Sequence, residues 1–122
     1  MRIKEFVAEA ATGPMVYHGN QGGIHSELIT PMWWTESRQD AESYATLNDN
    51  DGWVYSARLS CKKPYVVKST DETNTVVEKW RELAKLGYDC VNDQDVGDWI
   101  PFYAKDIHLT GEPEYIDNKH EL

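Results

Sequence analysis

Short apolar segments alternate with polar turns along the whole chain, and their order restricts the folds that it can adopt. An alternating or compact apolar run predicts a strand, whereas apolar residues three or four positions apart predict a helix. The expected strands are residues 15–18, 31–35, 53–59, 64–67, 88–91, 99–103 and 107–110, and the expected helices are residues 3–11, 37–48 and 73–86. This irregular order of strands and helices predicts an α+β fold.

Individual residues sharpen these boundaries. Gly19 is expected to end the first strand, and Gly87 stands at the C-terminal position of the helix that precedes it. Pro101 favours an edge strand or a bulge, because proline has no N–H to donate to a ladder. Tyr44 is expected on the apolar face of the helix over 37–48.

The length of the chain predicts a single domain over residues 1–122. Within it we expect an N-terminal helix in residues 1–12 and an acidic tail in residues 111–122 that frays. Cys61 and Cys90 are too few and too far apart to indicate a metal site, and each is expected to be a buried free thiol. The opening segment lacks an apolar signal region, and no apolar run is long enough to span a membrane, so we expect a cytoplasmic protein.

The net charge of −9 arises from 21 acidic and 12 basic residues. It disfavours direct binding to nucleic acid, which requires a clustered basic surface. A basic, nucleic-acid-binding protein is a more natural partner, and an acidic surface can also mimic nucleic acid. Simple solubility explains the same charge without any partner.

Three groups of residues have side chains suited to chemistry. A strand-end His18 can offer a ring nitrogen to a ligand hydroxyl, and Gly19 allows a ligand to approach the backbone. Trp33 and Tyr44 can stack on the two sides of a flat cationic ring. Asp98 at the start of a strand can bind a ribose hydroxyl and stabilise a developing positive charge.

Each group also has a purely structural interpretation. A histidine at a strand end is often a structural hydrogen-bonding residue, and aromatic side chains often build the core. An aspartate after glycine is common in turns. Taken one at a time, these interpretations are favoured, so the order and spacing of the three groups carry the functional hypothesis.

Together they resemble the His…Tyr…Glu branch of the ADP-ribosyltransferase superfamily, the diphtheria-toxin and poly-ADP-ribose-polymerase type. The segment from Trp34 to Ala45 and those over 63–67, 86–91 and 98–102 are similar to segments of its small bacterial and phage members, and the resemblance covers about residues 15–110. It implies a split β-sandwich of two small sheets with two to four flanking helices.

The resemblance also implies the site. NAD⁺ would be the substrate. The residues implied to bind it are His18, Gly19, Trp33, Thr35 and Tyr44, and those implied to be catalytic are Asp98, His18 and Tyr44. Two positions depart from the family pattern, because Asp98 stands where glutamate is usual and Trp33 replaces the first tyrosine of the stacking pair. The shorter carboxylate puts the efficiency of transfer in question.

Contacts with an acceptor are expected from two polar segments. The loop from Gly19 to Thr30 would close over NAD⁺. The acceptor would be met by His25 and Glu27 of this loop and by Asp93, Gln94 and Asp95 of the later turn. The competing interpretation of both segments is solvated loop surface.

The expected function is therefore mono-ADP-ribosylation of a host protein, in the cytoplasm, by a phage-encoded anti-CRISPR or host-takeover effector. Three other possibilities stay open. The chain can be a catalytically weak NAD-binding module, an NAD glycohydrolase that uses water as acceptor, or an acidic inhibitor of a nucleic-acid-binding protein. Only the first two and the transferase require a pocket.

Overall fold

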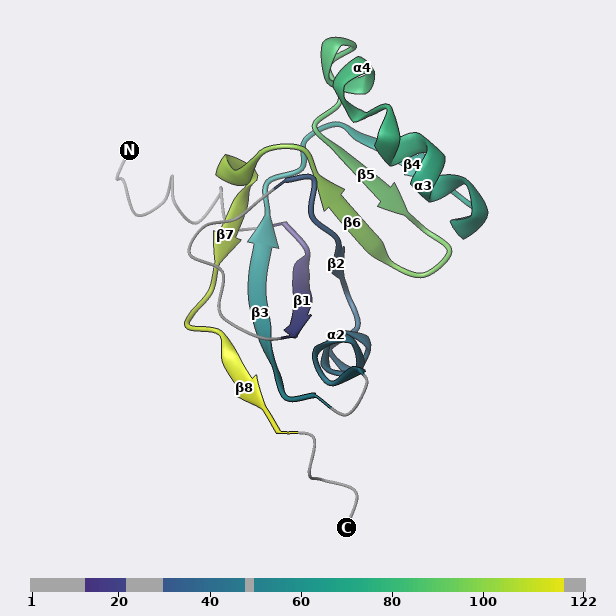
Figure 1. The fold of residues 1–122 in the computed structure, drawn as a ribbon. Coiled ribbons are helices and arrows are strands. Elements are labelled where there is room, and N and C mark those ends of the chain that lie inside the picture. Colours follow the sequence, from purple (N-terminus) through teal and green to yellow (C-terminus); the bar gives the residue numbers. More distant parts are fainter. Residues whose placement is uncertain (1–12, 22–29, 48–49, 118–122) are drawn as a thin grey trace, which may run out of the picture.

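A computed structural model describes residues 13–21, 30–47 and 50–117 of the chain. Figure 1 shows an arrangement of strands with helices packed beside them. The strands are β1 (Met15–Gln21), β2 (Trp34–Thr35), β3 (Gly52–Leu59), β4 (Pro64–Val67), β5 (Cys90–Asp93), β6 (Asp98–Pro101), β7 (Ile107–Leu109) and β8 (Glu114–Ile116). The helices are α2 (Arg38–Ala45), α3 (Thr70–Glu78), α4 (Trp80–Lys85) and the 3₁₀ turn η2 (Ala104–Asp106). The α+β composition predicted from the sequence is confirmed.

Hydrogen bonds join the strands into one eight-stranded sheet in the order β4-β5-β6-β2-β1-β3-β7, with β8 also paired to β3. The pairing of β4 with β5 is parallel, and the other pairs are antiparallel. We expected two small sheets, whereas the described strands form one continuous sheet. The connection between the two halves of the observed sheet is narrow, because β2 has only two residues and pairs with β1 through Thr35 alone.

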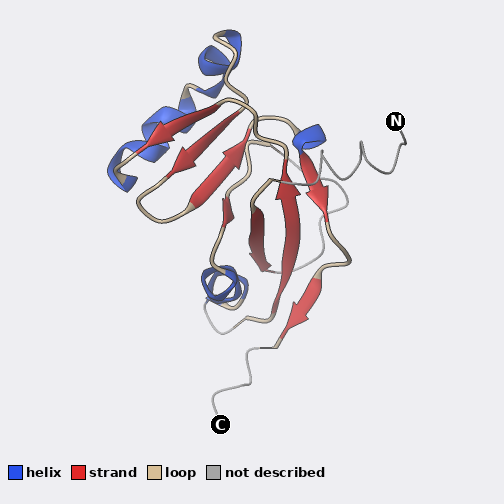
Figure 2. Cartoon of the chain, turned by 180° about the vertical axis from the view of Figure 1, so that it is seen from behind, coloured by secondary structure: helices blue, strands red, loops and turns tan. Residues whose placement is uncertain are grey.

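This short connection divides the sheet into a larger arm (β1, β3, β7 and β8) and a smaller arm (β4, β5 and β6). Figure 2 shows the two arms from behind, with α3 and α4 along the smaller arm and α2 beside the end of the larger one. Separate hydrophobic clusters follow this division: Val16, Trp34 and Leu59 belong to one on the larger arm, and Val91 and Ile100 to one on the smaller arm. The connection at β2 is therefore where a pocket can form.

Helix α2 begins as expected after a capping residue, since the Ser37 hydroxyl accepts a hydrogen bond from the N–H of Asp40 at 3.1 Å. Its buried face is formed by Ala41 and Ala45, which pack with Val54 of β3. Tyr44 lies outside this face and is 64% exposed, so its predicted place on the apolar face was wrong. Small side chains suffice because the helix lies close to the sheet.

The helix expected over 73–86 starts earlier, at Thr70, and is interrupted at Lys79, which separates α3 from α4. The residues of the two helices that pack on the smaller arm are Val76, Val77, Trp80, Leu83 and Ala84. Gly87 follows with φ of +99°, which confirms its role at the C-terminal end.

Two expectations about strand ends were wrong. Strand β6 lies between β5 and β2, so Pro101 is not on an edge; it is the last residue of its strand and lies beyond the pairing with β2. The tail does not simply fray after Gly111, because β8 pairs with β3 and Glu114 forms an ion pair with Arg38 of α2. The expected helix over 3–11 lies outside the described residues.

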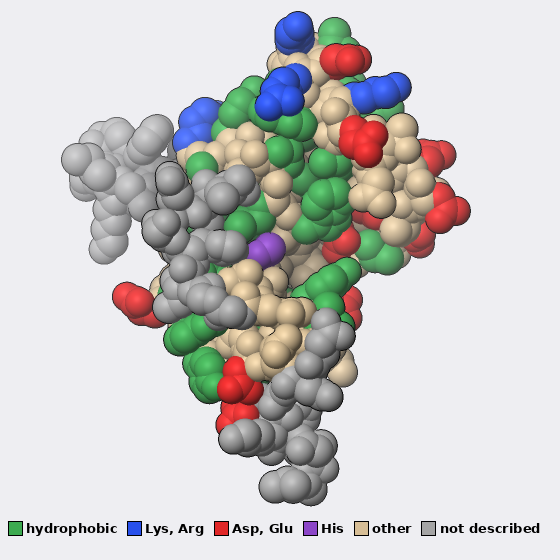
Figure 3. Space-filling view, in the orientation of Figure 1, with side chains coloured by type: hydrophobic (Ala, Val, Ile, Leu, Met, Phe, Trp, Pro, Cys, Tyr) green, Lys and Arg blue, Asp and Glu red, His purple; other side chains and the backbone are tan. Residues whose placement is uncertain are grey.

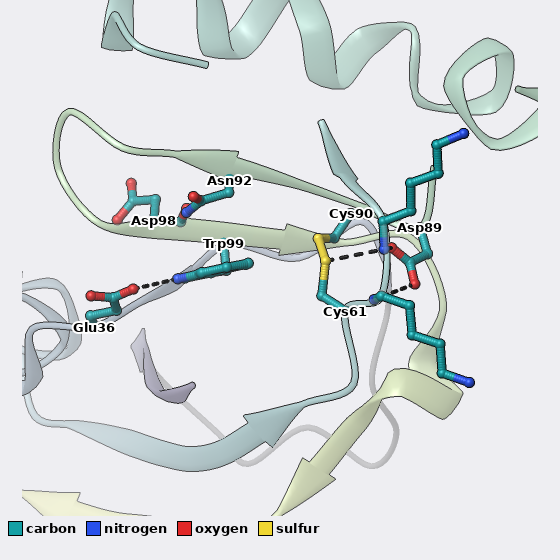
Figure 4. The surroundings of a disulfide bond; sticks show 9 residues. Glu36, Cys61, Asp89, Cys90, Asn92, Asp98 and Trp99 are labelled. Carbon is teal, nitrogen blue, oxygen red and sulfur yellow. Dashed lines mark hydrogen bonds between the residues drawn. A yellow bond between two sulfur atoms is a disulfide. The ribbon is translucent and has the colours of Figure 1, made fainter. Parts of the chain in front are cut away.

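Cys61 and Cys90 form a disulfide, with Cα atoms 6.1 Å apart, so the prediction of two free thiols was wrong (Figure 4). The fold brings the segment after β3 to the start of β5. There, Asp89 accepts hydrogen bonds from the backbone N–H groups of Lys62 and Lys63 at 2.8 and 2.9 Å. A separation of 29 residues along the chain hides this contact from sequence analysis. None of the helices in the described residues is long and apolar enough to cross a membrane.

Candidate active site

A pocket of about 470 Å³ lies where the two arms of the sheet meet. Its walls come from β1, the β2 segment, α2, α3, β5 and β6. The structure brings all six residues that the sequence singled out for NAD⁺ into this one pocket: His18, Gly19, Trp33, Thr35, Tyr44 and Asp98. Residues 80 positions apart therefore meet through the pairing of β1 with β2 and of β2 with β6.

His18 is held in a fixed orientation by its backbone and ring contacts. It lies within β1, opposite Tyr55 of β3. We expected Gly19 to end this strand, but the strand continues to Gln21. Its Nδ1 lies 2.7 Å from the carbonyl oxygen of Trp33, and its ring packs on Trp34 at 5.5 Å between centroids. A carbonyl only accepts, so Nδ1 carries the proton, and Nε2 is the acceptor of the neutral ring.

Gly19 also has a structural role that the sequence did not reveal. A Cβ added to it would lie 1.9 Å from the carbonyl oxygen of Ala41 in α2. Gly52 on β3 shows the same relation to Ala45, at 2.0 Å. The two glycines let α2 approach the sheet closely, and this places the helix as one wall of the pocket. The expected role of Gly19 in ligand approach is therefore joined by a packing role.

Trp33 and Tyr44 present two large rings at the pocket. Trp33 is 38% exposed and Tyr44 is 64% exposed, whereas the neighbouring Trp34 is buried in the core. Both rings also line a second, shallower hollow of about 540 Å³ that adjoins the first. Exposed aromatic side chains on a pocket wall are suited to stacking on a planar ligand. The alternative that both are core residues is excluded by their exposure.

Asp98 is the first residue of β6 and pairs with Thr35 of β2. Burial of its carboxyl, followed by the negative charge of Asp93, raises the pKa of Asp98 from 3.8 to about 6. Asp40 and Glu36 add to this increase, while a hydrogen bond with the side chain of Thr35 opposes it. An aspartate with this pKa in a pocket is a candidate functional residue.

Asp93 is a pocket residue that sequence analysis placed in an exposed turn. It is the last residue of β5, is 1% exposed, and accepts a hydrogen bond from the Thr73 hydroxyl at 2.8 Å. Gln94 and Asp95 do lie on the exposed turn as expected. Gly97, with φ of +78°, closes that turn and sets the register in which Asp93 faces Asp98. Gly97 is the residue in the sequence from which the turn between Asp93 and Asp98 could have been predicted. His25 and Glu27 lie outside the described residues.

The described walls of the pocket carry carboxylates but no lysine or arginine. The nearby Arg38 is occupied, because it pairs with Glu42 at 2.9 Å and with Glu114. In the face shown in Figure 3, the visible Lys and Arg side chains lie around α4, at the top of the smaller arm, and beside η2, above β7 of the larger arm. The pocket is thus electrostatically suited to a ligand with positive charge.

The raised pKa of Asp98 predicts how an Asp98→Asn variant affects stability. The folded state holds the Asp98 proton more tightly than the unfolded chain does, so stability falls as pH rises from about 4 through about 6. At pH 8 the variant should therefore be more stable by about 1 kcal/mol, after a discount for solvent screening, or about 4 °C in Tm. At pH 4 the two proteins should melt together. A variant less stable by the same amount at both pH values would show instead that the hydrogen bond with Thr35 dominates.

Comparisons with known proteins add no identification. No model of a protein family matches the chain, and no curated protein matches it either. The functional interpretation therefore depends on the residues and geometry of the pocket.

Proposed function

We propose that the chain is a mono-ADP-ribosyltransferase that uses NAD⁺ as its substrate, with the pocket as its active site. The observation that carries this proposal is the convergence of His18, Trp33, Tyr44 and Asp98 on a single pocket. These are the residue types that nicotinamide riboside chemistry needs: a ribose-binding imidazole, two stacking rings and a carboxylate. The narrow joint at β2 supports the proposal that the fold is an ADP-ribosyltransferase-like split β-sandwich.

In the proposed mechanism, Trp33 and Tyr44 hold the nicotinamide ring by stacking and cation–π attraction. His18 binds a ribose hydroxyl, with its ring fixed through the Trp33 carbonyl. The Asp98 carboxylate binds the ribose 2′-hydroxyl and opposes the positive charge that grows as the bond between ribose C1′ and the nicotinamide nitrogen breaks. Nicotinamide leaves with the bonding electron pair, the acceptor forms the new bond to C1′, and its proton passes to solvent.

We further propose a basic, nucleic-acid-binding host protein as the acceptor. The net charge of −9 and the carboxylates of the pocket support a partner of opposite charge. The corresponding biological setting is the host cytoplasm, with the protein as a phage-encoded anti-CRISPR or host-takeover effector. This setting rests on the sequence resemblance and on the small size of the chain.

The proposal is tested by incubating the purified protein with biotin-labelled NAD⁺ and a bacterial lysate. The assay follows both labelled protein and free nicotinamide. A transferase gives a labelled band together with stoichiometric nicotinamide. Nicotinamide without any labelled band identifies an NAD glycohydrolase. Neither product in several lysates, with no NAD⁺ binding by calorimetry, would refute the proposed function and favour an acidic inhibitor.

Loss of either stacking ring should weaken NAD⁺ binding. Trp33→Ala and Tyr44→Ala are each expected to raise the Kd for NAD⁺ about fivefold to tenfold, since each removes a stacking contact worth about 1 kcal/mol. Both side chains are substantially exposed, so folding should be little affected. Tyr115→Ala is the matched control, because Tyr115 is 50% exposed and lies on β8, outside the pocket walls. Unchanged affinity in both pocket variants, measured by calorimetry, would show that the rings do not clamp the ligand.

A further inference from the structure

A second carboxylate, that of Asp93, lies directly opposite the candidate catalytic Asp98. Asp93 and Asp98 face each other across the β5–β6 hairpin, and both contribute to the pocket wall. Directly opposed residues of an antiparallel pair have Cβ atoms about 5 Å apart on the same face of the sheet. Like charges at such a position destabilise a hairpin, so this pairing is unfavourable for the fold itself.

The surrounding contacts fix the Asp93 carboxylate in place. One oxygen accepts the hydroxyl hydrogen bond of Thr73 at 2.8 Å, and the other accepts the backbone N–H of Asp95 at 2.9 Å. Thr73 is itself 3% exposed and belongs to α3, so the anchor joins the helix to the end of β5. Together the two hydrogen bonds hold both carboxylate oxygens of Asp93 in place.

The other acidic side chains near Asp98 are more exposed to solvent than Asp93. Asp40 on α2 and Glu36 before that helix are exposed, and Glu36 accepts a hydrogen bond from the Trp99 indole at 2.6 Å. From β1, the pocket receives His18 and Tyr17, and from α3 it receives hydroxyl and amide side chains without charge. Asp93 is therefore the buried charge that faces Asp98, and solvent screens it less than it screens Asp40 or Glu36.

We propose that Asp93 is a positioning residue of this site: a buried carboxylate, fixed by Thr73 and the Asp95 N–H directly opposite Asp98, that acts electrostatically on Asp98. The proposal rests on the proposed function for its role in catalysis. Two adjacent negative charges also raise the local attraction for a cationic nicotinamide ring and for the positive charge that develops on the ribose. A cation bound in the pocket relieves the repulsion between the two carboxylates, so ligand binding and deprotonation of Asp98 are coupled.

The decisive measurement is a carboxyl ¹³C NMR titration of Asp98 in the protein without ligand. In Asp93→Asn, the amide oxygen can accept from the Asp95 N–H while the amide nitrogen donates to the Thr73 hydroxyl, so both contacts can persist although the charge is gone. The titration midpoint of Asp98 should then fall by about one pH unit. Asp40→Asn is the matched control, because it removes an exposed carboxylate near the same residue, and the midpoint should move by less than about 0.3 units. Equal midpoints in Asp93→Asn and the wild-type protein would overturn the proposal.

An activity profile separates this inference from the proposed function. In Asp93→Asn, the acidic limb of nicotinamide release should move to lower pH by the same interval as the NMR midpoint. A merely structural role would lower the rate at every pH without moving the limb. If the Asp98 midpoint falls in Asp93→Asn but the wild-type protein releases no nicotinamide at any pH, the transferase proposal is refuted while the coupling between Asp93 and Asp98 stands.

Discussion

Asp98→Asn is expected to lower the rate of nicotinamide release from NAD⁺ by at least about a hundredfold, while the Kd for NAD⁺ changes less than about threefold. Loss of one preorganised electrostatic group at a reacting centre typically costs this much in kcat. Asparagine keeps the shape of the side chain and an acceptor oxygen, but it cannot oppose the positive charge on the ribose. The affinity should survive because the stacking contacts proposed for Trp33 and Tyr44 are unchanged in this variant.

The pH dependence of the wild-type rate provides a second readout of the same residue. The carboxylate is the active form, and the pKa of Asp98 is raised to about 6, so the rate should fall tenfold for each pH unit below that value. An aspartate with an ordinary pKa would retain full activity at pH 5. The residual rate of Asp98→Asn should lack this limb.

A matched control is Asp117→Asn, which removes one carboxylate after β8, outside the pocket walls. It should retain the wild-type rate and pH profile. Steady-state nicotinamide assays and calorimetric Kd values for the three proteins distinguish the possibilities. An Asp98→Asn protein with wild-type kcat would remove Asp98 from the mechanism and leave the pocket as a binding site.

Sequence analysis located most elements because their patterns are local. The alternation over 53–59 identified β3, in which Tyr55, Ala57 and Leu59 form the expected buried face. Val54, on the opposite face, is also buried, against α2. The pattern over 37–48 identified α2, which Ser37 caps. Such patterns depend on contacts within one segment, so they survive without knowledge of its neighbours.

Pairing between distant segments was not visible in the same way. Nothing near Thr35 indicates that it bridges β1 and β6, and the disulfide between Cys61 and Cys90 depends on where the sheet brings its two ends. Asp93 looks like a turn residue by type, yet the register set by Gly97 places it inside the pocket. Polar residues buried through tertiary contacts violate the local rule that identifies loops.

Tyr44 lines the pocket although its predicted burial in α2 was wrong. Its spacing from Trp33 predicted a place at the ligand, and the ring does line the pocket. Its apolar character also predicted a place on the buried face of α2, which Ala41 and Ala45 occupy instead. A ring with its face in solvent is available to a ligand, so the failure of the burial prediction is what makes the site prediction possible.

Gly19→Ala should destabilise the protein by about 3 kcal/mol and lower its Tm by about 10 °C. The new methyl group would lie 1.9 Å from the backbone oxygen of Ala41, and its third neighbour is the backbone N of Ala45 at 3.0 Å. Backbone atoms cannot rotate away as a side chain does, so α2 has to move as a unit. Calorimetry or thermal circular dichroism measures the loss, and Gly111→Ala is the control because nothing lies within 4 Å of the added methyl group.

The same variant distinguishes two roles for Gly19. If the glycine served only ligand approach, Gly19→Ala would weaken NAD⁺ binding at an unchanged Tm. If it serves the close packing of α2, Tm falls first, and affinity falls with it because α2 carries Tyr44 to the pocket wall. The helix also reaches β1 through the Gln21 side chain, which donates to the Tyr44 carbonyl at 3.3 Å, so a shift of α2 disturbs the ring and its support together. A pocket built across a two-residue strand depends on such close contacts, since within the described sheet the two arms pair through β2.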